Sequence, residues 1–326
     1  MRTSFTYRNS TFLKKTRLIT EQMLAIMRLY RSNKFEIMHA HGFAAALSAL
    51  PCKFIFRVPI VITTHGSEML WPKETRWVRP AELRLTLRFD SLIMRMCDLI
   101  IAQSKGVKKY MVAFYGRAIE TKVKLVPTGL DEKKFSVPTK AFADSQVLFV
   151  GALSEIKGVT CLLNAFSKVH EKHPDAKLVL VGGGPATQHY KELAEVLGLE
   201  RSVDFAGVIR DDNRLLEFYA ASDILALPST VGAPIPVTIL EAMSCGKAVV
   251  STNTLGSIPD ILTRDVGIII EPGDTDQLAR EIERLIIDKE LQRNLGQNAR
   301  EAIVKFYTLD IMIDKLLYYY GMLTGR

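Results

Sequence analysis

The chain has 326 residues, of which 48% are hydrophobic and 24% charged, and 43 Lys and Arg against 35 Asp and Glu give a net charge of +8. This composition excludes disordered and fibrous proteins, and the length suggests about two domains. Four cysteines lie in apolar contexts without metal-type spacing, so we expect reduced core residues in a cytosolic protein. Charged residues interrupt the longest apolar stretches, which argues against a membrane-spanning helix, and no signal peptide is evident.

The first part of the chain alternates short apolar runs with helical patterns. We expect helices at 12–30, 44–50 and 105–114, and strands at 35–39, 58–63, 99–102 and 123–126. His39 and His41 come at the end of the first of these strands, and His65 follows the second. Ligands of open parallel sheets bind at such strand ends, so these histidines are candidates for direct function. The alternative is that backbone groups satisfy them.

A basic, amphipathic segment lies between the second and third expected strands. Its arginines and tryptophans, interleaved with leucines, are Arg76, Arg79, Arg84, Arg88, Arg95, Trp71 and Trp77. An anionic membrane surface or a phosphate-bearing substrate fits the Trp and Leu content better than nucleic acid, for which no recognised motif is present. A solvated basic helix without a partner is the remaining alternative.

A second alternating series follows a polar, proline-containing linker at 136–145. We expect strands at 147–150, 176–181, 203–206, 224–227, 248–251 and 267–270, and helices at 159–170, 186–197, 213–221, 236–246, 277–287 and 309–322. Strands interleaved with helices predict an α/β protein with a parallel sheet covered on both faces. Asp274 and Asp276 match a metal-binding Asp-x-Asp pattern, but they directly precede a helix and are better explained as its cap, so we expect no metal.

Two glycine-containing turns follow strands of this second series. The first, GALSEIKG, begins at Gly151 and contains Lys157; the second contains Gly182 and Gly183. Glycines let backbone amides approach a phosphate, and a lysine supplies a point charge for it. Simple chain reversal and an exposed lysine are the alternatives. The third glycine of a dinucleotide fingerprint is missing, which disfavours an NAD enzyme.

An almost wholly apolar helix is expected from Pro236 to Gly246, with Glu241 in its middle. The free amides of Val237 and Thr238 at its amino end favour phosphate. Glu241 is then either a ligand for a diol or a stray surface glutamate of a core helix.

In this order, the segments resemble a family-four glycosyltransferase over nearly the whole chain. The motifs that carry the resemblance are EIMHAHG, VITTHG, AQSKGVKKYM, LVPTGLDEKKF, GALSEIKG, LVLVGGGP, FAGVIRDD, FYAASDILALPS, TILEAMSCGKAVVST, GSIPDIL and VGIIIEPGDTDQLAREI. The resemblance implies the GT-B fold, with two Rossmann-like domains facing across a cleft. Residues 1–140 would form the acceptor-side domain and 141–308 the nucleotide-sugar-binding domain, and the helix in 309–326 would pack back on the first domain.

The resemblance also implies transfer of a sugar from a nucleotide-sugar donor, with retention of configuration and without a cofactor. The implied donor-binding residues are Gly151, Lys157, Gly182, Gly183, Ile209, Val237, Thr238 and Glu241. Glu241 would hold the ribose, Lys157 the diphosphate and Ile209 the base. His65 would reach the donor sugar through hydrogen bonding, so His65 and Lys157 are the catalytic candidates. The donor would be a UDP- or GDP-sugar, and the acceptor a glycolipid or cell-envelope polysaccharide at the inner face of the membrane.

The chain departs from the family pattern at three positions and at its start. Ala233 stands where a second glutamate usually contacts the donor sugar, Ala152 replaces an arginine of the diphosphate clamp, and Thr128 replaces an asparagine. No opening strand and glycine-rich loop precede Phe12, so we expect a truncated first domain. Either the start of the gene was assigned too far downstream, or a partner chain supplies the missing piece, or the protein is not fully active.

These departures leave two functions of different class. The first is an active retaining glycosyltransferase. The second is a non-catalytic or partner-dependent GT-B subunit that binds nucleotide sugar without turnover alone. A GT-B phosphorylase is a distant third, because no cofactor lysine motif is identifiable.

Overall fold

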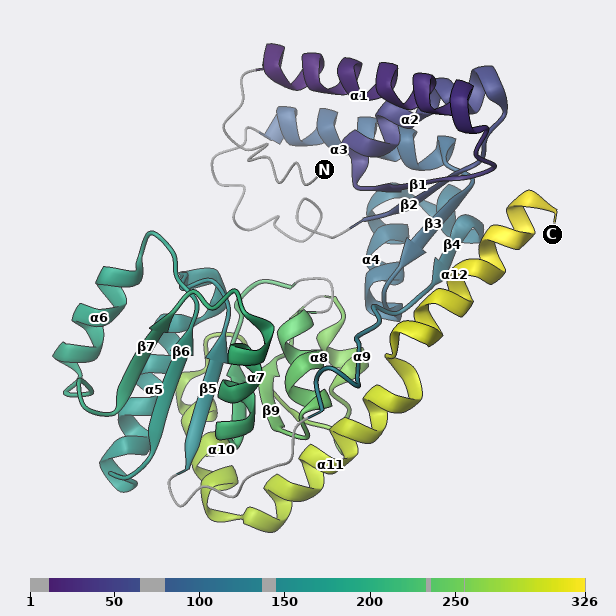
Figure 1. Ribbon diagram of the computed structural model, residues 1–326. Helices are drawn as coiled ribbons and strands as arrows, with labels where there is room; N and C mark the ends of the chain where they lie inside the picture. Colours follow the sequence, from purple (N-terminus) through teal and green to yellow (C-terminus); the bar gives the residue numbers. More distant parts are fainter. Residues whose placement is uncertain (1–11, 65–79, 137–144, 233–235, 255, 326) are drawn as a thin grey trace. The chain divides into compact units, whose positions relative to one another are not determined.

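The computed structural model describes residues 12–64, 80–136, 145–232, 236–254 and 256–325. The chain divides into two compact units, shown in Figure 1. Unit 1 comprises residues 1–102, 108–126 and 314–326, and unit 2 comprises residues 103–107 and 127–313.

Unit 1 is built on a four-stranded parallel sheet in the order β1-β2-β3-β4. The strands are β1 (Met38–His41), β2 (Ile60–Thr63), β3 (Leu99–Ala102) and β4 (Val123–Leu125). The helices that begin in the first half of the chain are α1 (Phe12–Asn33), α2 (Phe43–Phe56), α3 (Pro80–Met96) and α4 (Lys105–Tyr115). Every residue of β2 and β3 is buried, as expected of apolar runs in a parallel sheet covered on both faces.

The first strand differs from the expected one. The predicted bounds of this strand, 35–39, are wrong, because β1 runs from Met38 to His41 and pairs His41 with Thr63. His39 and His41 are therefore strand residues. Helix α2 is also longer than expected, since it continues through Pro51 to Phe56.

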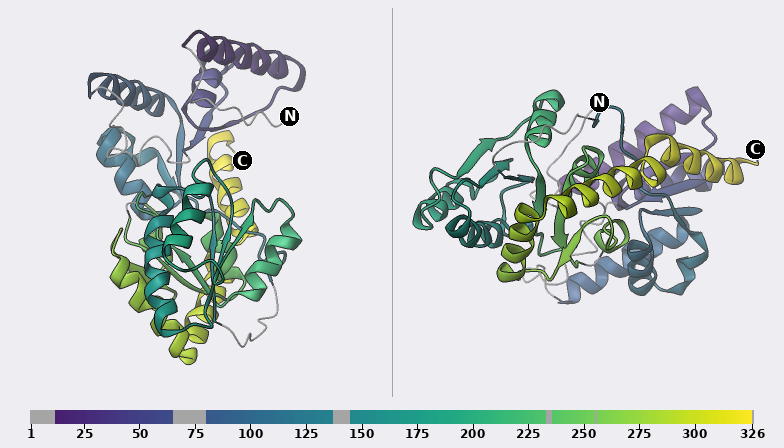
Figure 2. Two further views of the ribbon diagram at one scale, coloured as in Figure 1. Left: turned by 90° about the vertical axis from the view of Figure 1, so that its left-hand side faces the viewer. Right: turned by 90° about the horizontal axis from the view of Figure 1, so that it is seen from below.

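Unit 2 contains a six-stranded parallel sheet in the order β10-β9-β8-β5-β6-β7. The strands are β5 (Gln146–Val150), β6 (Lys177–Val181), β7 (Val203–Gly207), β8 (Ile224–Leu227), β9 (Ala248–Thr252) and β10 (Ile268–Ile270). The helices are α5 (Val159–Lys172), α6 (Thr187–Val196), α7 (Asp212–Ala221), α8 (Val237–Ser244), α9 (Ile258–Ile261), α10 (Thr275–Ile287) and α11 (Lys289–Phe306). The last helix of the chain is α12 (Leu309–Thr324). Two further views are given in Figure 2. The helices of this unit and its buried strands enclose one continuous apolar core.

Local sequence signals explain several helix boundaries in unit 2. The carboxylate of Asp274 accepts a hydrogen bond of 2.8 Å from the amide of Gln277, so the predicted cap of α10 is confirmed. Asp211 caps α7 in the same way. Asp276 forms an ion pair with Lys168 of α5.

Helix α12 is shared between the two groupings of residues. Its first residues group with unit 2, and those from Asp314 onward group with unit 1. Within unit 1, the hydroxyl of Tyr320 on α12 lies in hydrogen-bond contact with Nδ1 of His39. Nε2 of His39 is 2.7 Å from the hydroxyl of Thr63, so the ring is held on both sides.

Candidate functional site

The strand order of unit 2 reverses between the parallel neighbours β5 and β8, because β6 follows on one side of this pair and β9 on the other side. Ligands of doubly wound sheets bind outside the carboxyl ends of the strands at such a switch point. The turn after β5 carries Lys157, and the chain after β8 leads to α8. The amide of Thr230 donates a 3.0 Å hydrogen bond to the carbonyl of Ile156, so these two loops are in direct contact.

Close contacts between glycines join the loops after β6 and β7 to the loop after β5. We call the loops that follow β5, β6, β7 and β8 the row of loops. The amide of Gly182 donates a 2.8 Å hydrogen bond to the carbonyl of Gly207. Gly182 has a φ of +141°, and a Cβ there would overlap the carbonyl oxygen of Gly151. At Gly183 a Cβ would lie 2.9 Å from Cγ2 of Val208. Gly182 is therefore required for the loops after β5 and β6 to touch, because a side chain at this position would overlap the backbone of Gly151.

Lys157 ends a short 3₁₀ turn, Glu155–Lys157, directly before helix α5. Its side chain is partly buried, and loss of solvation lowers the pKa of its ammonium group. Within the described part of the chain it forms no ion pair. A partly desolvated cation without a counter-ion is suited to binding a phosphate.

No side chain of the described residues caps the amino end of α8. Pro236 occupies the cap position with a φ of −65°, and the helix proper begins at Val237. The amide of Ile239 bonds to the carbonyl of Pro236, and the side chain of Val237 is 47% exposed. The amides of the first turn carry partial positive charge, so this end of α8 can accept an anion.

Glu241 lies one turn further along α8 and is held by a buried tyrosine of α7. The hydroxyl of Tyr219 donates a hydrogen bond of 2.7 Å to Oε2 of Glu241 and lies 3.3 Å from the carbonyl oxygen of Thr238. Tyr219 is fully buried. Burial raises the pKa of the Glu241 carboxyl, and the Tyr219 hydrogen bond opposes that rise. Of the two alternatives, a stray surface glutamate does not fit this geometry.

The turn from Asp131 to Phe135 lies next to this carboxylate. Lys134 forms an ion pair with Asp212 at the start of α7, and both charges act on the pKa of Glu241. The ring of Phe135 packs edge-on against Tyr219, with centroids 6.4 Å apart. Sequence reasoning missed Tyr219, although it belongs to the motif FYAASDILALPS, because its role depends on packing between α7 and α8.

Ile209 follows β7, at the far end of the row of loops. It is partly buried and packs against the apolar core of unit 2. The adjacent Val208 is 65% exposed. Val208 lies beside Gly183 of the glycine turn, and such an exposed apolar side chain is suited to the flat face of a base.

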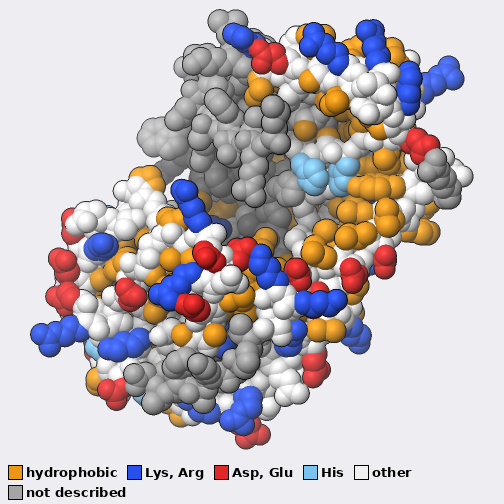
Figure 3. All heavy atoms as spheres, in the orientation of Figure 1, with side chains coloured by type: hydrophobic (Ala, Val, Ile, Leu, Met, Phe, Trp, Pro, Cys, Tyr) orange, Lys and Arg blue, Asp and Glu red, His pale blue; other side chains and the backbone are white. Residues whose placement is uncertain are grey.

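The predicted catalytic histidine, His65, lies outside the described residues, as does Ala233. His39 and His41 are the other histidines of unit 1, with rings stacked at a centroid distance of 4.6 Å. Figure 3 shows histidine side chains of this unit at the surface beside hydrophobic side chains. Because Thr63 and Tyr320 engage both nitrogens of His39, its ring serves first to hold β1, β2 and α12 together.

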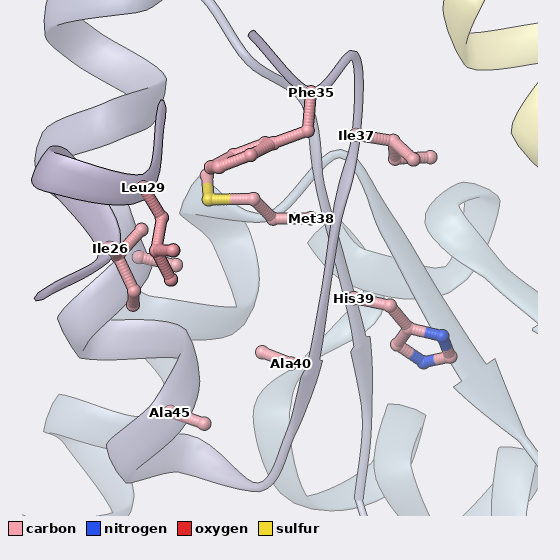
Figure 4. Close-up of a pocket in the computed structure, with 9 residues that line it drawn as sticks. Ile26, Leu29, Phe35, Ile37, Met38, His39, Ala40 and Ala45 are labelled. Atoms are coloured by element: carbon pink, nitrogen blue, oxygen red, sulfur yellow. The ribbon is translucent and has the colours of Figure 1, made fainter. Parts of the chain in front are cut away.

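An apolar pocket of about 290 Å³ lies in unit 1 between α1, β1 and α2. Its lining includes Ile26 and Leu29 of α1, Met38 of β1 and Ala45 of α2, and His39 points away from them in Figure 4. The described residues that line the pocket include no Lys or Arg. The pocket therefore does not fit a nucleotide diphosphate.

Two parallel α/β units of this kind define the GT-B class, and comparison with known proteins agrees. Residues 131–302 match the family described as glycosyl transferases group 1, and residues 3–134 match glycosyltransferase family 4. The chain belongs to the glycosyl transferases group 1 family and is a glycosyltransferase. An uncharacterized glycosyltransferase of Methanocaldococcus jannaschii is 26% identical over 318 residues, covering 92% of this chain and 78% of that protein.

Solved structures show the same fold. HepE of Anabaena, crystallised in complex with UDP, superimposes with a TM-score of 0.78 and 23% identity, covering 92% of this chain and 82% of that one. Sucrose-phosphate synthase of Thermosynechococcus elongatus superimposes with a TM-score of 0.82 and 21% identity, covering 97% and 81%. The prediction of a GT-B fold is confirmed.

Two further properties concern the described residues only. None of their helices is both long enough and apolar enough to cross a membrane. They also contain no cluster of three or more His, Cys, Asp or Glu side chains arranged to hold a metal ion.

Proposed function

We propose that the chain is a retaining glycosyltransferase that moves a sugar from a nucleotide-sugar donor to a glycolipid, polysaccharide or similar acceptor. The observation that carries the proposal is the row of loops at the carboxyl edge of the unit 2 sheet. There, Lys157 has no counter-ion among the described residues, α8 begins without a side-chain cap, and Glu241 is oriented by Tyr219. A cation and the amides at a helix start can bind a diphosphate, and a carboxylate can accept hydrogen bonds from ribose hydroxyls.

A UDP-sugar is the donor we favour over a GDP-sugar. HepE of Anabaena was crystallised with UDP and with UDP-glucose, and it shares the fold of this chain. The free oxygen of Glu241 would accept hydrogen bonds from the ribose diol. Val208 and Ile209 would lie against the base.

The chemistry proposed for the protein is stabilisation of the leaving group. Breaking the bond between the sugar and the diphosphate places negative charge on the diphosphate oxygens. Lys157 and the amides of Val237 and Thr238 would lower the energy of that charge. His65 would position the donor sugar by hydrogen bonding, and the acceptor would attack from the face that the leaving group occupies.

Transfer of labelled sugar to a lipid or glycan acceptor tests this proposal. NMR of the product identifies its anomeric configuration, and we expect the configuration of the donor to be kept. Inversion of configuration would reject the retaining mechanism, while failure of Glu241→Ala to reduce transfer would reject the assigned site.

A partner-dependent subunit is the second candidate. Ala152 is exposed at the start of the turn that carries Lys157, so the turn has a single cation where the resembling family has two. This candidate predicts that nucleotide sugar binds to the isolated chain but is not turned over. Addition of a second protein would then restore transfer, whereas turnover by the chain alone would exclude this candidate.

A further inference from the structure

Unit 1 carries a hollow that the donor site does not use. It has a volume of about 490 Å³ and lies where the second half of α3 meets the end of α4. Its lining residues are Arg88, Ser91, Leu92, Arg95, Ala113, Phe114, Tyr115 and Gly116. The hydroxyl of Ser91 donates a 3.2 Å hydrogen bond to the carbonyl of Tyr115, which joins the two walls.

Two arginines of α3 supply the charge of this hollow. Arg88 and Arg95 are seven positions apart, about two helical turns, and so lie on one face of α3. Both side chains are exposed, and in the described part of the chain neither forms an ion pair. One guanidinium nitrogen of Arg95 lies beside Gly116, which has no side chain to cover it. The hollow therefore presents two arginines to an incoming anion.

Two exposed apolar side chains line the same hollow, Leu92, which is 54% exposed, and Phe114, which is 39% exposed. Phe89, which follows Arg88 in α3, is 48% exposed. Phe114 is held in place by stacking on Tyr110, with ring centroids 4.4 Å apart. Apolar side chains of this size beside exposed arginines are suited to entering the boundary between headgroups and acyl chains.

We propose that this hollow binds the phosphodiester headgroup of an anionic phospholipid at a membrane surface. Arg88 and Arg95 pair with the phosphate, and Phe89, Leu92 and Phe114 enter the acyl boundary around it. Charge complementarity selects an anion, and the apolar rim selects a lipid over a free phosphate, which would leave that rim exposed to water. This inference rests on the proposed function, in which a glycolipid acceptor would lie at a membrane surface, and it gives the chain a site for contact with that surface. Because this site lies in unit 1 and the donor site in unit 2, lipid binding and donor binding can be tested independently of each other.

Sedimentation of the full chain with lipid vesicles tests the inference. Vesicles of phosphatidylcholine with phosphatidylglycerol are compared with vesicles of phosphatidylcholine alone, without any nucleotide sugar. The double variant Arg88→Gln/Arg95→Gln should bind the anionic vesicles about 30-fold more weakly, at about fivefold or slightly more for each arginine. The matched control is Arg28→Gln/Arg31→Gln, which removes the same charge from exposed positions of α1 and should retain binding within about threefold.

Apolar variants separate a headgroup site from a phosphate site. Leu92→Ser and Phe114→Ser should each weaken vesicle binding at least fivefold, while Phe54→Ser, an exposed side chain at the end of α2, should not. If Arg88→Gln/Arg95→Gln and Arg28→Gln/Arg31→Gln lost the same affinity for anionic vesicles, the attraction would depend on net charge alone, and the proposal would be overturned. Saturable binding of glycerol 3-phosphate without vesicle binding, or binding of RNA through the same arginines, would overturn it as well. Melting temperatures of all variants confirm that each is folded.

Discussion

The hydroxyl of Tyr219 donates a hydrogen bond of 2.7 Å to Oε2 of Glu241, joining the end of α7 to the middle of α8. The remaining carboxyl oxygen has no hydrogen-bond donor among the described residues. A carboxylate that is held on one side and free on the other is oriented before a ligand arrives. The side chain of Glu241 therefore loses little conformational entropy when a ligand binds.

Glu241→Gln should change the stability of the ligand-free protein in a pH-dependent way. The pKa of Glu241 is raised by burial, so the folded state binds more protons than the unfolded state between the ordinary and the raised pKa. Glu241 therefore destabilises the protein progressively as pH rises through that window. Urea denaturation measures the free energy of unfolding of Glu241→Gln and of the native protein. The value for the variant minus the value for the native protein should increase as pH rises from 4 to 8.

The same variant should lose donor affinity. The free oxygen of Glu241 would accept from the ribose diol, whereas in Gln the oxygen that accepts from Tyr219 leaves an NH2 group facing the diol. The loss of a charged hydrogen bond costs about 1.5–3 kcal/mol. Gain of stability together with loss of binding is the signature of a ligand site. A loss of stability at pH 8 would instead identify Glu241 as a structural residue of α8.

Tyr219→Phe should weaken donor binding and shift its dependence on pH. Because the hydroxyl opposes the rise in the pKa of Glu241, its removal raises that pKa further. The acid limb of the binding profile, measured by calorimetric titration, should therefore move to higher pH, with about a tenfold loss of affinity at neutral pH. Tyr307→Phe is the control, since that hydroxyl lies outside the site. An unchanged acid limb would refute the role of Tyr219.

Lys157→Met should reduce affinity for a nucleoside diphosphate but not for the nucleoside. A charged hydrogen bond of about 1.5–3 kcal/mol corresponds to roughly a tenfold to hundredfold change in dissociation constant. Lys168→Met removes an exposed lysine that pairs with Asp276 and should leave both affinities unchanged. Parallel titrations with UDP and uridine distinguish the two cases. Equal losses for UDP and uridine would mean that Lys157 does not contact the diphosphate.

Gly182→Ala should destabilise unit 2 more than a glycine substitution that is strained but unobstructed. Gly198 also has a positive φ, of +71°, yet a Cβ at that position would meet no atom within 4 Å, so Gly198→Ala should cost about 1–2 kcal/mol. At Gly182 the overlap with the carbonyl of Gly151 adds to that strain, and we expect about 2–5 kcal/mol in all. Urea denaturation of both variants measures the difference. Equal losses would show that close contact between the loops is not required.

The sequence predicted the strands of unit 2 closely, because each is a short buried run of apolar residues between turns. Strand β8, for example, lies at Ile224–Leu227, as expected. Helix α11 was not predicted, although Leu295, Ala299 and Ile303 repeat every four residues and are buried. The charged residues between them hid this spacing.

Some residues of the candidate site were also predicted from the sequence, and others were not. Lys157 and Glu241 were found because glycine turns, strand ends and an isolated charge are local signals. Tyr219 was missed because its hydrogen bond joins two helices, and the contact of His39 with Tyr320 spans 281 positions of the chain. Partners so distant in sequence are set by the fold alone.

Binding of a nucleotide sugar by the isolated chain tests the central claim most directly. Titration with UDP-, GDP- and ADP-sugars should find one class that binds and stabilises the protein. That binding should be lost in Glu241→Ala and kept in the exposed control Glu301→Ala. Persistence of full affinity in Glu241→Ala, or the absence of binding for every donor, would contradict the assignment of the site to the carboxyl edge of the unit 2 sheet.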